Sequence, residues 1–254
     1  MSVSKQSTWV RHQTEDGLQW SPVSSGGTEI TCAGSEPTQE AMQAFGPVAY
    51  DYLNVLPPAS PTRVVGLAKN RESKDQLPIV FLMTPSSIIG SGEKIRIPGD
   101  RGPTWSEVEL AFVVSKTAKD VPKTDAEEYI RGYTVANDVT TENINERDWH
   151  LVRGKALDTY CPTGPHLVTG VDTDGLRMTT RVNGELRQET STSPRKLGDA
   201  AALAHVTSLM TLEPGDLVVT GTPSSPLDST IEPGDTTTVE IENIGSLSNT
   251  VEEM

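Results

Sequence analysis

The stretch WSEVELAFVV, residues 105–114, has the pattern of a β-strand and raises the first question about function. Successive side chains of an extended strand alternate between its two faces, so Glu107 and Glu109 share one face. The apolar side chains point the other way, towards a core: Val108, Leu110 and Phe112. Two like charges this close repel each other. The acidic face is therefore either a solvated surface or the site of a hard divalent cation, whose charge turns repulsion into coordination.

The composition favours a β protein over a helical bundle. The chain has 254 residues, enough for one large domain or two small ones, and its 21 glycines and 18 prolines suit short strands joined by turns. No apolar run approaches the roughly 20 residues that a membrane span needs. The first thirty residues contain no apolar segment of a secretory signal. We therefore expect a cytoplasmic protein.

Charge and metal-binding residue types narrow the function further. The chain carries 35 acidic and 21 basic residues, a formal net charge of -14, which argues against nucleic acid or anionic membranes as partners. The same acidity would suit a salty cytoplasm. Cys32 and Cys161 are too few for a disulfide framework or a thiolate site, and the four histidines lack zinc-binding spacing. Any metal is therefore expected to have oxygen ligands.

We expect the chain to divide into a small N-terminal region, residues 1–62, and a larger domain, residues 63–254. We expect a mainly β (α+β) fold with a few short helices. In the first region we predict two strands, a short helix and a proline-containing linker: 7–11, 28–32, 40–53 and 56–62. In the second we predict strands at 63–68, 79–85, 93–98, 107–114 and 133–140, and in the segments DLVVTGTP and TTTVEIENIGSLSNTV.

Three local signals in the second region are more specific. Residues 125–133 read as a helix, with Thr124 and Glu127 spaced as a capping box. Asn183-Gly184 marks the turn of a β-hairpin. A helix is expected over 199–210, where His205 is expected to be a packed or surface residue and not a catalytic one.

A third carboxylate accompanies the first two. Asp138 stands in GYTVANDVT (132–140), where a buried strand is expected to end, and is either a turn residue or a ligand held by a rigid element. With Glu107 and Glu109 it would give three carboxylates from two neighbouring strands. This set suits Mg²⁺ or Mn²⁺ and leaves positions for water and a chelating substrate.

Two Gly- and Pro-rich segments contribute further polar residues. RGKALDTYCPTGP (153–165) holds Lys155 and Asp158, and we expect Asp158 to contact the substrate. A lysine beside a metal neutralises charge on a bound enolate or carboxylate, although most lysines are surface residues. The segment LEPGDLVVTGTP (212–223) ends in Gly221 and Thr222. Such a strand end exposes hydroxyl and backbone donors to an anion, or is only a structural turn.

Six segments in this order resemble the fumarylacetoacetate hydrolase family, over roughly residues 63–251. They are ELAFVV after the ExE pair, GYTVANDVT, KALDTYCPTGP, VNGELRQ, TLEPGDLVVTGTP and IGSLSNTV. The resemblance implies a mixed β-roll, usually a homodimer. It also implies that Glu107, Glu109 and Asp138 are Mg²⁺ or Mn²⁺ ligands. Lys155 matches the family's active-site lysine, and Thr222 matches its substrate-carboxylate contact.

The chain departs from the family at the lid. Many members carry GxNYxxHxxE, whose His–Glu pair activates water, whereas this chain has GLAKNRESKDQLP (66–78). Aligned from Gly66, the histidine and glutamate positions hold Glu72 and Asp75; aligned on Asn70, the histidine position falls on Lys74. Both alignments lack the histidine. The arginine that often follows NDVT in C–C hydrolases is also absent.

These departures favour one class of reaction over another. A metal that chelates a 2-oxo acid stabilises an enolate, which serves tautomerisation and decarboxylation; C–C hydrolysis also needs an activated water. GLAKN is similar to the lid start of the 2-hydroxyhepta-2,4-diene-1,7-dioate isomerase and 5-oxopent-3-ene-1,2,5-tricarboxylate decarboxylase branch. We therefore expect an isomerase (tautomerase) or decarboxylase of 2-oxo or 2-hydroxy-dienoic (di)carboxylic acids in aromatic-compound catabolism, with Glu72, Asp75 or Lys74 as proton shuttle. The alternatives are an acylpyruvate or fumarylpyruvate hydrolase and a metal-binding protein without activity.

Overall fold

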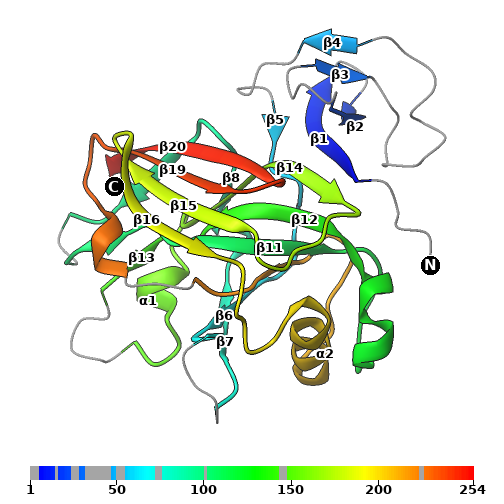
Figure 1. Cartoon of the computed structure of the whole chain (residues 1–254). Coiled ribbons are helices and arrows are strands. Elements are labelled where there is room, and N and C mark those ends of the chain that lie inside the picture. The colour runs from blue at the N-terminus through cyan, green and yellow to red at the C-terminus, as the bar shows by residue number, and fades with distance from the viewer. Residues whose placement is uncertain are drawn as a thin grey trace.

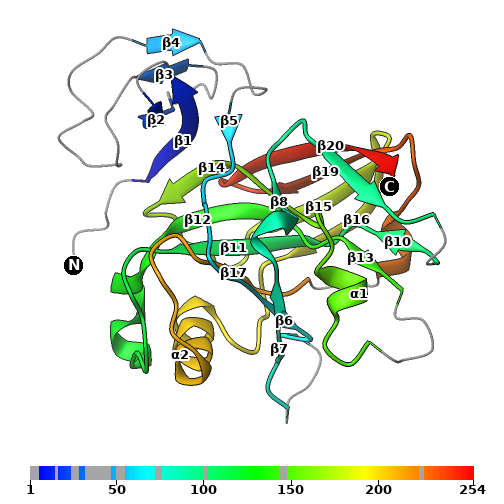
Figure 2. The same ribbon diagram turned by 180° about the vertical axis from the view of Figure 1, so that it is seen from behind.

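Two stacked β-sheets form the body of the protein in a computed structural model (Figures 1 and 2). The structure describes residues 6–14, 17–23, 29–31, 47–49, 55–71, 76–99, 102–142, 148–222 and 226–254. Within these residues the mainly β prediction is confirmed, with mixed sheets and short helices. None of the helices in this part of the chain is long and apolar enough to cross a membrane.

The central sheet is mixed and carries the site. Its strands lie in the order β2 (Gly17–Pro22), β1 (Ser7–Thr14), β14 (Cys161–Thr169), β12 (Ile130–Asn137), β11 (Val108–Val114), β17 (Leu217–Val219), β6 (Val64–Ala68) and β7 (Ile79–Met83). Two short strands join beside this path: β5 (Val55–Leu56) on β1 and β8 (Ile88–Ile89) on β14. β11 lies in the middle and pairs with β12 and β17, so all seven of its residues are buried.

The second sheet covers one face of the central sheet (Figure 1). Its strands are β16 (Glu185–Ser191), β15 (Arg177–Val182), β19 (Thr236–Ile241), β20 (Gly245–Glu253) and β9 (Lys94–Ile97). Val108 and Leu110 of β11 pack between the sheets against Met178 and Val239. These apolar contacts hold the two sheets together.

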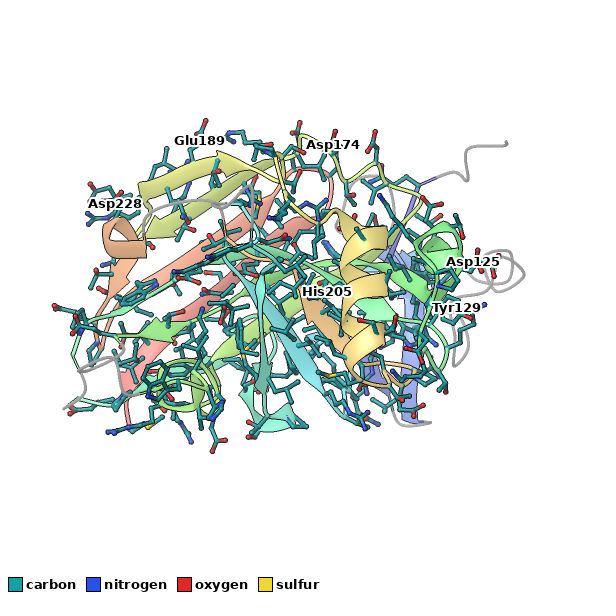
Figure 3. All side chains as sticks on the ribbon, turned by 90° about the horizontal axis from the view of Figure 1, so that it is seen from below. Asp125, Tyr129, Asp174, Glu189, His205 and Asp228 are labelled. Atoms are coloured by element: carbon teal, nitrogen blue, oxygen red, sulfur yellow. The ribbon has the colours of Figure 1, made fainter. Side chains whose placement is uncertain are left out.

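The remaining elements are short. A three-stranded sheet contains β13 (Thr140–Thr141), β10 (Thr104–Trp105) and β18 (Thr230–Ile231), and a two-stranded sheet contains β3 (Glu29–Thr31) and β4 (Pro47–Ala49). The helices are α1 (Val152–Lys155), α2 (Asp199–Leu209) and the 3₁₀ segments η3 (Pro85–Ser87), η4 (Lys123–Tyr129) and η6 (Pro226–Ser229). α2 packs on η4 beside the central sheet (Figure 3).

The alternation predicted for β11 is present. Val108 and Leu110 belong to the cluster between the sheets, and Phe112 belongs to the cluster under α2. Ala111 and Val113 lie in a different cluster on the other face. Residues of the same parity therefore share a face, which places Glu109 on the face of Ala111 and Val113.

The helix predicted over 125–133 is confirmed as a 3₁₀ helix as far as Tyr129 and is wrong beyond it. The chain there forms η4 and then enters β12 at Ile130, where β11 and β14 pair on its two sides. The predicted capping box does not form: Pro122 is the N-cap, and the Thr124 hydroxyl donates to Asp125 Oδ1 at 2.8 Å. Ladder hydrogen bonds on both sides outweigh the local helix signal.

The other strand, hairpin and helix predictions of the second region agree with the structure. In the first region, β4 occupies 47–49 within the stretch predicted as a helix, and the rest of that stretch lies outside the described residues. The predicted linker is packed: Pro58 and Ala59 are buried, and the Arg11 guanidinium donates to the carbonyl oxygens of Pro57 and Ala59. β1 extends the central sheet beside β14. The division at residue 62 stays a prediction.

Candidate metal centre

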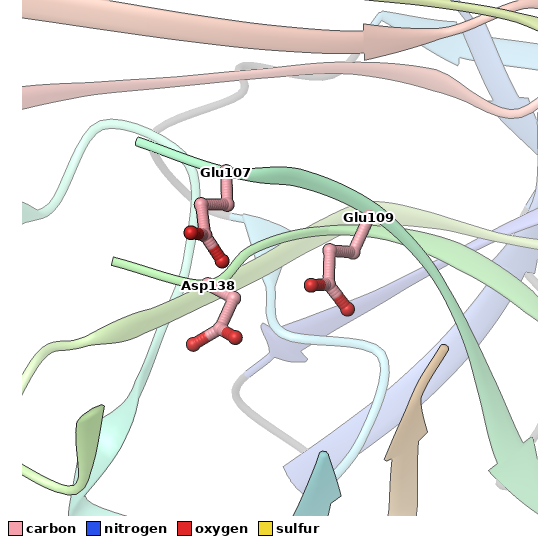
Figure 4. A group of neighbouring side chains, drawn as sticks. All are labelled: Glu107, Glu109 and Asp138. Carbon is pink, nitrogen blue, oxygen red and sulfur yellow. The ribbon is translucent and has the colours of Figure 1, made fainter. Parts of the chain in front are cut away.

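Three carboxylates meet where β11 begins and β12 ends. In the antiparallel pair Val108 faces Asn137, so Glu107, just before β11, lies beside Asp138, just after β12. The Asp138 N–H donates to the Glu107 carbonyl at 2.9 Å. Glu109 follows two residues along, on the face of Glu107. One ligand oxygen from each of the three side chains lies within 4.8 Å of the others (Figure 4). We call this group the carboxylate triad.

The triad is withdrawn from water. Glu107, Glu109 and Asp138 are 7%, 3% and 1% exposed. Burial, and after it the charge of Asp138, raises the pKa of Glu109 well above its ordinary value. Burial raises the pKa of Asp138 to about 6, against the opposing charge of Lys155. Three buried carboxylates in this arrangement call for positive charge.

Lys155 supplies part of that charge. Its Nζ donates to Glu107 Oε2 at 2.9 Å, Asp138 Oδ2 at 2.5 Å and Thr140 Oγ1 at 2.7 Å. Burial alone would lower the pKa of Lys155, but the charges of Asp138, Glu107 and Glu109 outweigh burial and raise it. The lysine is therefore protonated, and its single positive charge interacts with all three carboxylates.

A single helical turn places this lysine. Lys155 is the last residue of α1, which packs on β13. The Gly154 N–H donates to Asp148 Oδ2 at 2.8 Å, and a side chain at Gly154 would have its Cβ 3.0 Å from the Thr141 carbonyl oxygen. The absence of a side chain at Gly154 lets α1 approach the triad closely.

The two glutamates are also fixed by neighbours. Trp105 Nε1 donates to Glu107 Oε1 at 2.7 Å, and the Gly221 N–H donates to Glu109 Oε2 at 2.6 Å. Gly221 has φ +98°, and a Cβ there would lie 2.7 Å from the Leu67 carbonyl oxygen. Only glycine fits this position, and its amide holds the second glutamate in place.

The residues present fit a divalent ion. Asp138 Oδ1 is buried and has no hydrogen-bond partner among the described residues, although Asp138 Oδ2 is bonded to Lys155. Such an orphaned buried oxygen is costly unless a ligand satisfies it. All three side chains offer hard oxygen donors, which suit Mg²⁺ or Mn²⁺ better than zinc.

The other predicted site residues differ in how they relate to the triad. Thr222 follows Gly221, and its Oγ1 is buried with no partner in the described part of the chain. Asp158 is exposed and accepts a hydrogen bond from Ser86 Oγ at 2.5 Å, and within the described part of the chain it does not group with the three carboxylates. Glu72, Lys74 and Asp75 lie outside the described residues. The roles predicted for all of them stay predictions. His205 lies on α2 beside η4 (Figure 3).

Sequence reasoning missed three neighbours of the triad. Trp105 stands two residues before Glu107, so strand alternation could have found it. Thr140 accepts from Lys155, and Asn70, fully buried, donates to the Thr220 carbonyl at 2.8 Å. The asparagine follows a predicted strand, but no local pattern relates it to residue 220.

Comparison with known proteins identifies the family of the chain and similar folds. Residues 53–252 match the family model described as fumarylacetoacetate (FAA) hydrolase C-terminal. The crystal structure of 2-hydroxyhepta-2,4-diene-1,7-dioate isomerase from Mycobacterium marinum is similar in fold, with a TM-score of 0.85 and 32% identity. The similarity covers 97% of this chain and 98% of that one.

Two curated relatives are similar in sequence. The mitochondrial oxaloacetate tautomerase fahd2 of Xenopus laevis is 37% identical over 191 residues, 68% of this chain and 58% of that protein. Maleylpyruvate hydrolase of Aquipseudomonas alcaligenes is 38% identical over 172 residues, 66% of this chain and 58% of that protein. The aligned part thus spans little more than half the length of these two relatives.

Proposed function

Because the chain belongs to the fumarylacetoacetate hydrolase family, we propose that it is a divalent-metal-dependent enzyme of 2-oxo or 2-hydroxy-dienoic (di)carboxylic acids. The reaction is isomerisation (tautomerisation) or decarboxylation through an enolate. The observation that carries this proposal is the buried carboxylate triad, which shares one lysine and in which Asp138 Oδ1 has no partner among the described residues. The isomerase and the tautomerase named above support the choice of reaction.

Glu107, Glu109 and Asp138 would hold Mg²⁺ or Mn²⁺. When bound, the ion supplies a Lewis acid that draws electrons from the 2-oxo group and favours loss of a proton or of carbon dioxide from the neighbouring carbon. Trp105 and Gly221 hold the two glutamates with donors at 2.7 and 2.6 Å, so these carboxylates need little rearrangement. Their burial excludes water from the ligands.

Lys155 would stabilise the negative charge that develops on the enolate oxygen. Its ammonium is fixed by two triad members and Thr140, within 2.9 Å of each. A preorganised cation in a buried site stabilises an enolate oxygen without rearrangement of solvent. The unpartnered Thr222 hydroxyl would donate to the substrate's first carboxylate, with Gly221 shaping the backbone beside it.

Proton transfer needs a further group. We assign the shuttle between carbon and oxygen to Glu72 or Asp75, in the segment that joins β6 and β7. A carboxylate serves tautomerisation, where the proton to be removed is already acidified. Decarboxylation needs only that the resulting carbon is protonated afterwards.

A second candidate function is hydrolysis of a C–C bond in an acylpyruvate or fumarylpyruvate. The similarity to a maleylpyruvate hydrolase favours it. This reaction requires a base that activates water, and Glu72 or Asp75 would take that role. We also propose that the enzyme is a cytoplasmic homodimer in the catabolism of aromatic compounds.

One experiment separates these functions. Purified protein with Mn²⁺ or Mg²⁺ is mixed with oxaloacetate, an acylpyruvate or a 2-hydroxy-dienedioate; ultraviolet absorbance follows the enol and mass spectrometry identifies products. Isomerised or decarboxylated product, lost on chelation with EDTA, is expected. Free acid from C–C cleavage would move the hydrolase to first place. No conversion of any of the three, with metal bound, would favour a metal-binding protein without activity.

A further inference from the structure

Arg71 lies one residue beyond Asn70, which contacts Gly221 beside the carboxylate triad. The side-chain amide of Asn70 donates to the Thr220 carbonyl at 2.8 Å, and its Oδ1 accepts from the Leu197 N–H at 2.9 Å. A Cβ placed on Gly221 would lie 3.0 Å from Asn70 Cβ, so the two backbones are in contact. Gly221 in turn binds Glu109. The backbone before Arg71 is therefore fixed against the strand end that holds a triad member.

The guanidinium of Arg71 lacks an anionic partner. Nη1 donates to the Ser191 carbonyl oxygen, Nη2 lies 3.9 Å from Met178 Sδ, and Nε is buried without a hydrogen-bond partner among the described residues. In the same part of the chain no carboxylate lies within ion-pair distance of it. The edge formed by Nε and Nη2 is the one that binds a carboxylate with two parallel hydrogen bonds.

Other buried cations nearby are paired. Arg195 forms an ion pair with Asp199, and Lys155 is bonded to two members of the triad. Burial lowers the pKa of Arg71 to about 10, and the charge of Glu109 opposes this shift more than any other group. Glu109 thus acts on Arg71 through space without forming an ion pair. A half-buried cation with no anionic partner destabilises the folded state unless an anion binds to it.

The charge balance of the site indicates where that anion comes from. The three triad carboxylates are neutralised by Lys155 and a divalent ion together. Once the ion is bound, it neutralises the charge of Glu109, which then no longer stabilises the positive charge of Arg71. In the described part of the chain, Arg71 is then the remaining uncompensated cation near the triad. An anionic group on the substrate, distinct from the 2-oxo acid end, would compensate it.

We infer that Arg71 determines substrate specificity by binding the second carboxylate of a 2-oxo dicarboxylic acid whose 2-oxo acid end lies at the triad. This rests on the proposed function and narrows its substrate class to dicarboxylates. Substrate binding would turn the Nε and Nη2 edge from Met178 Sδ to that carboxylate, to which it donates two hydrogen bonds, while Nη1 stays bonded to Ser191. A monocarboxylic 2-oxo acid leaves the arginine unpaired and therefore binds more weakly.

Matched ligand pairs test this inference. Oxaloacetate and 2-oxobutyrate differ only in a terminal carboxylate in place of a methyl group, and so do 2-oxoglutarate and 2-oxopentanoate. Isothermal titration of each acid into the Mn²⁺-loaded full-length protein gives its Kd. We expect the dicarboxylate of at least one pair to bind about ten- to a hundred-fold more tightly, the range of a charge-assisted bidentate contact.

Variants test whether Arg71 causes the preference for dicarboxylates. In Arg71→Met the preference disappears because the dicarboxylate loses affinity, while the monocarboxylate stays within about two-fold of wild type. Arg71→Lys, which keeps the charge but not the fork, retains a reduced preference. Arg177→Gln removes an exposed arginine of β15 that pairs with Glu189, and it leaves the preference unchanged.

Two results would overturn the inference in distinguishable ways. Equal affinities within both pairs for wild type, or an unchanged preference in Arg71→Met, would remove the role of Arg71 and leave the proposed function standing. Absence of metal-dependent binding by all four acids would overturn both the inference and the proposed function.

Discussion

Lys155→Met is the substitution that tests the charge arrangement of the site most directly. In the metal-free protein the lysine is the cation bonded to Glu107 and Asp138, with both of those side chains and its own 9% exposed or less. Removing one partner from a buried ion pair leaves uncompensated charge and costs about 3–5 kcal/mol. For a chain of this size, each kcal/mol lowers Tm by about 2–4 °C. The expected fall in EDTA is thus about 6–20 °C.

Binding of the metal should restore the stability that Lys155→Met loses. A divalent ion provides the positive charge that the methionine cannot, and ligand binding stabilises the folded state by mass action. Thermal unfolding in EDTA and in excess Mn²⁺ should therefore show a larger rise in Tm for Lys155→Met than for wild type. Lys94→Met is the control: Lys94 pairs with Glu252 at 2.7 Å but is 61% exposed, so its loss costs at most about 1 kcal/mol.

Two outcomes would contradict the reasoning. A Tm of Lys155→Met in EDTA that lies no lower than that of the Lys94→Met control would mean that the lysine is not the counter-charge of the triad. Equal Mn²⁺-induced shifts in wild type and Lys155→Met would mean that the ion binds elsewhere.

Three further predictions concern the triad. Asp138→Asn removes a charged ligand with little change in size, so Mn²⁺ affinity measured by calorimetry should fall about 100-fold, while the far-ultraviolet circular dichroism stays as in wild type. The pKa of Asp138 is raised to about 6 and that of Glu109 is raised well above its ordinary value, so protons compete with an ion for both carboxylates as the pH falls. Mn²⁺ affinity should thus rise with pH, and titrations in buffers of different ionisation heat should show more proton release at pH 6 than at pH 8; equal release would refute this. Gly221→Ala places a Cβ 2.7 Å from the Leu67 carbonyl oxygen at φ +98°, so the free energy of unfolding should fall by about 1–3 kcal/mol and Mn²⁺ affinity should fall as well. The control is Gly184→Ala, at φ +80° with open space around it, which should lower the free energy of unfolding and leave Mn²⁺ affinity unchanged.

Local patterns were sufficient for much of the fold. The hairpin turn at Asn183-Gly184 has φ of 51° and 80°, as its sequence predicts, and α2 occupies 199–209 of the predicted 199–210. The alternation of β11 put both glutamates on one face because a strand repeats every two residues. The helix predicted over 125–133 ends early, at Tyr129, for the opposite reason. Its helix signal is local, but its strand partners β11 and β14 are brought to it only by the tertiary fold.

The sequence by itself determined the residue types of the site and the side of the strand on which Glu107 and Glu109 lie. Only the tertiary structure decided what surrounds them. Lys155 is 48 residues from Glu107 in the chain, the Gly221 amide is 112 residues from Glu109, and Arg71 is 120 residues from the Ser191 carbonyl that orients it. A periodicity of two or 3.6 residues carries no information over such separations. These contacts follow from sheet pairing and burial, which add donors and charges from distant segments to a pair of glutamates that one strand had already aligned.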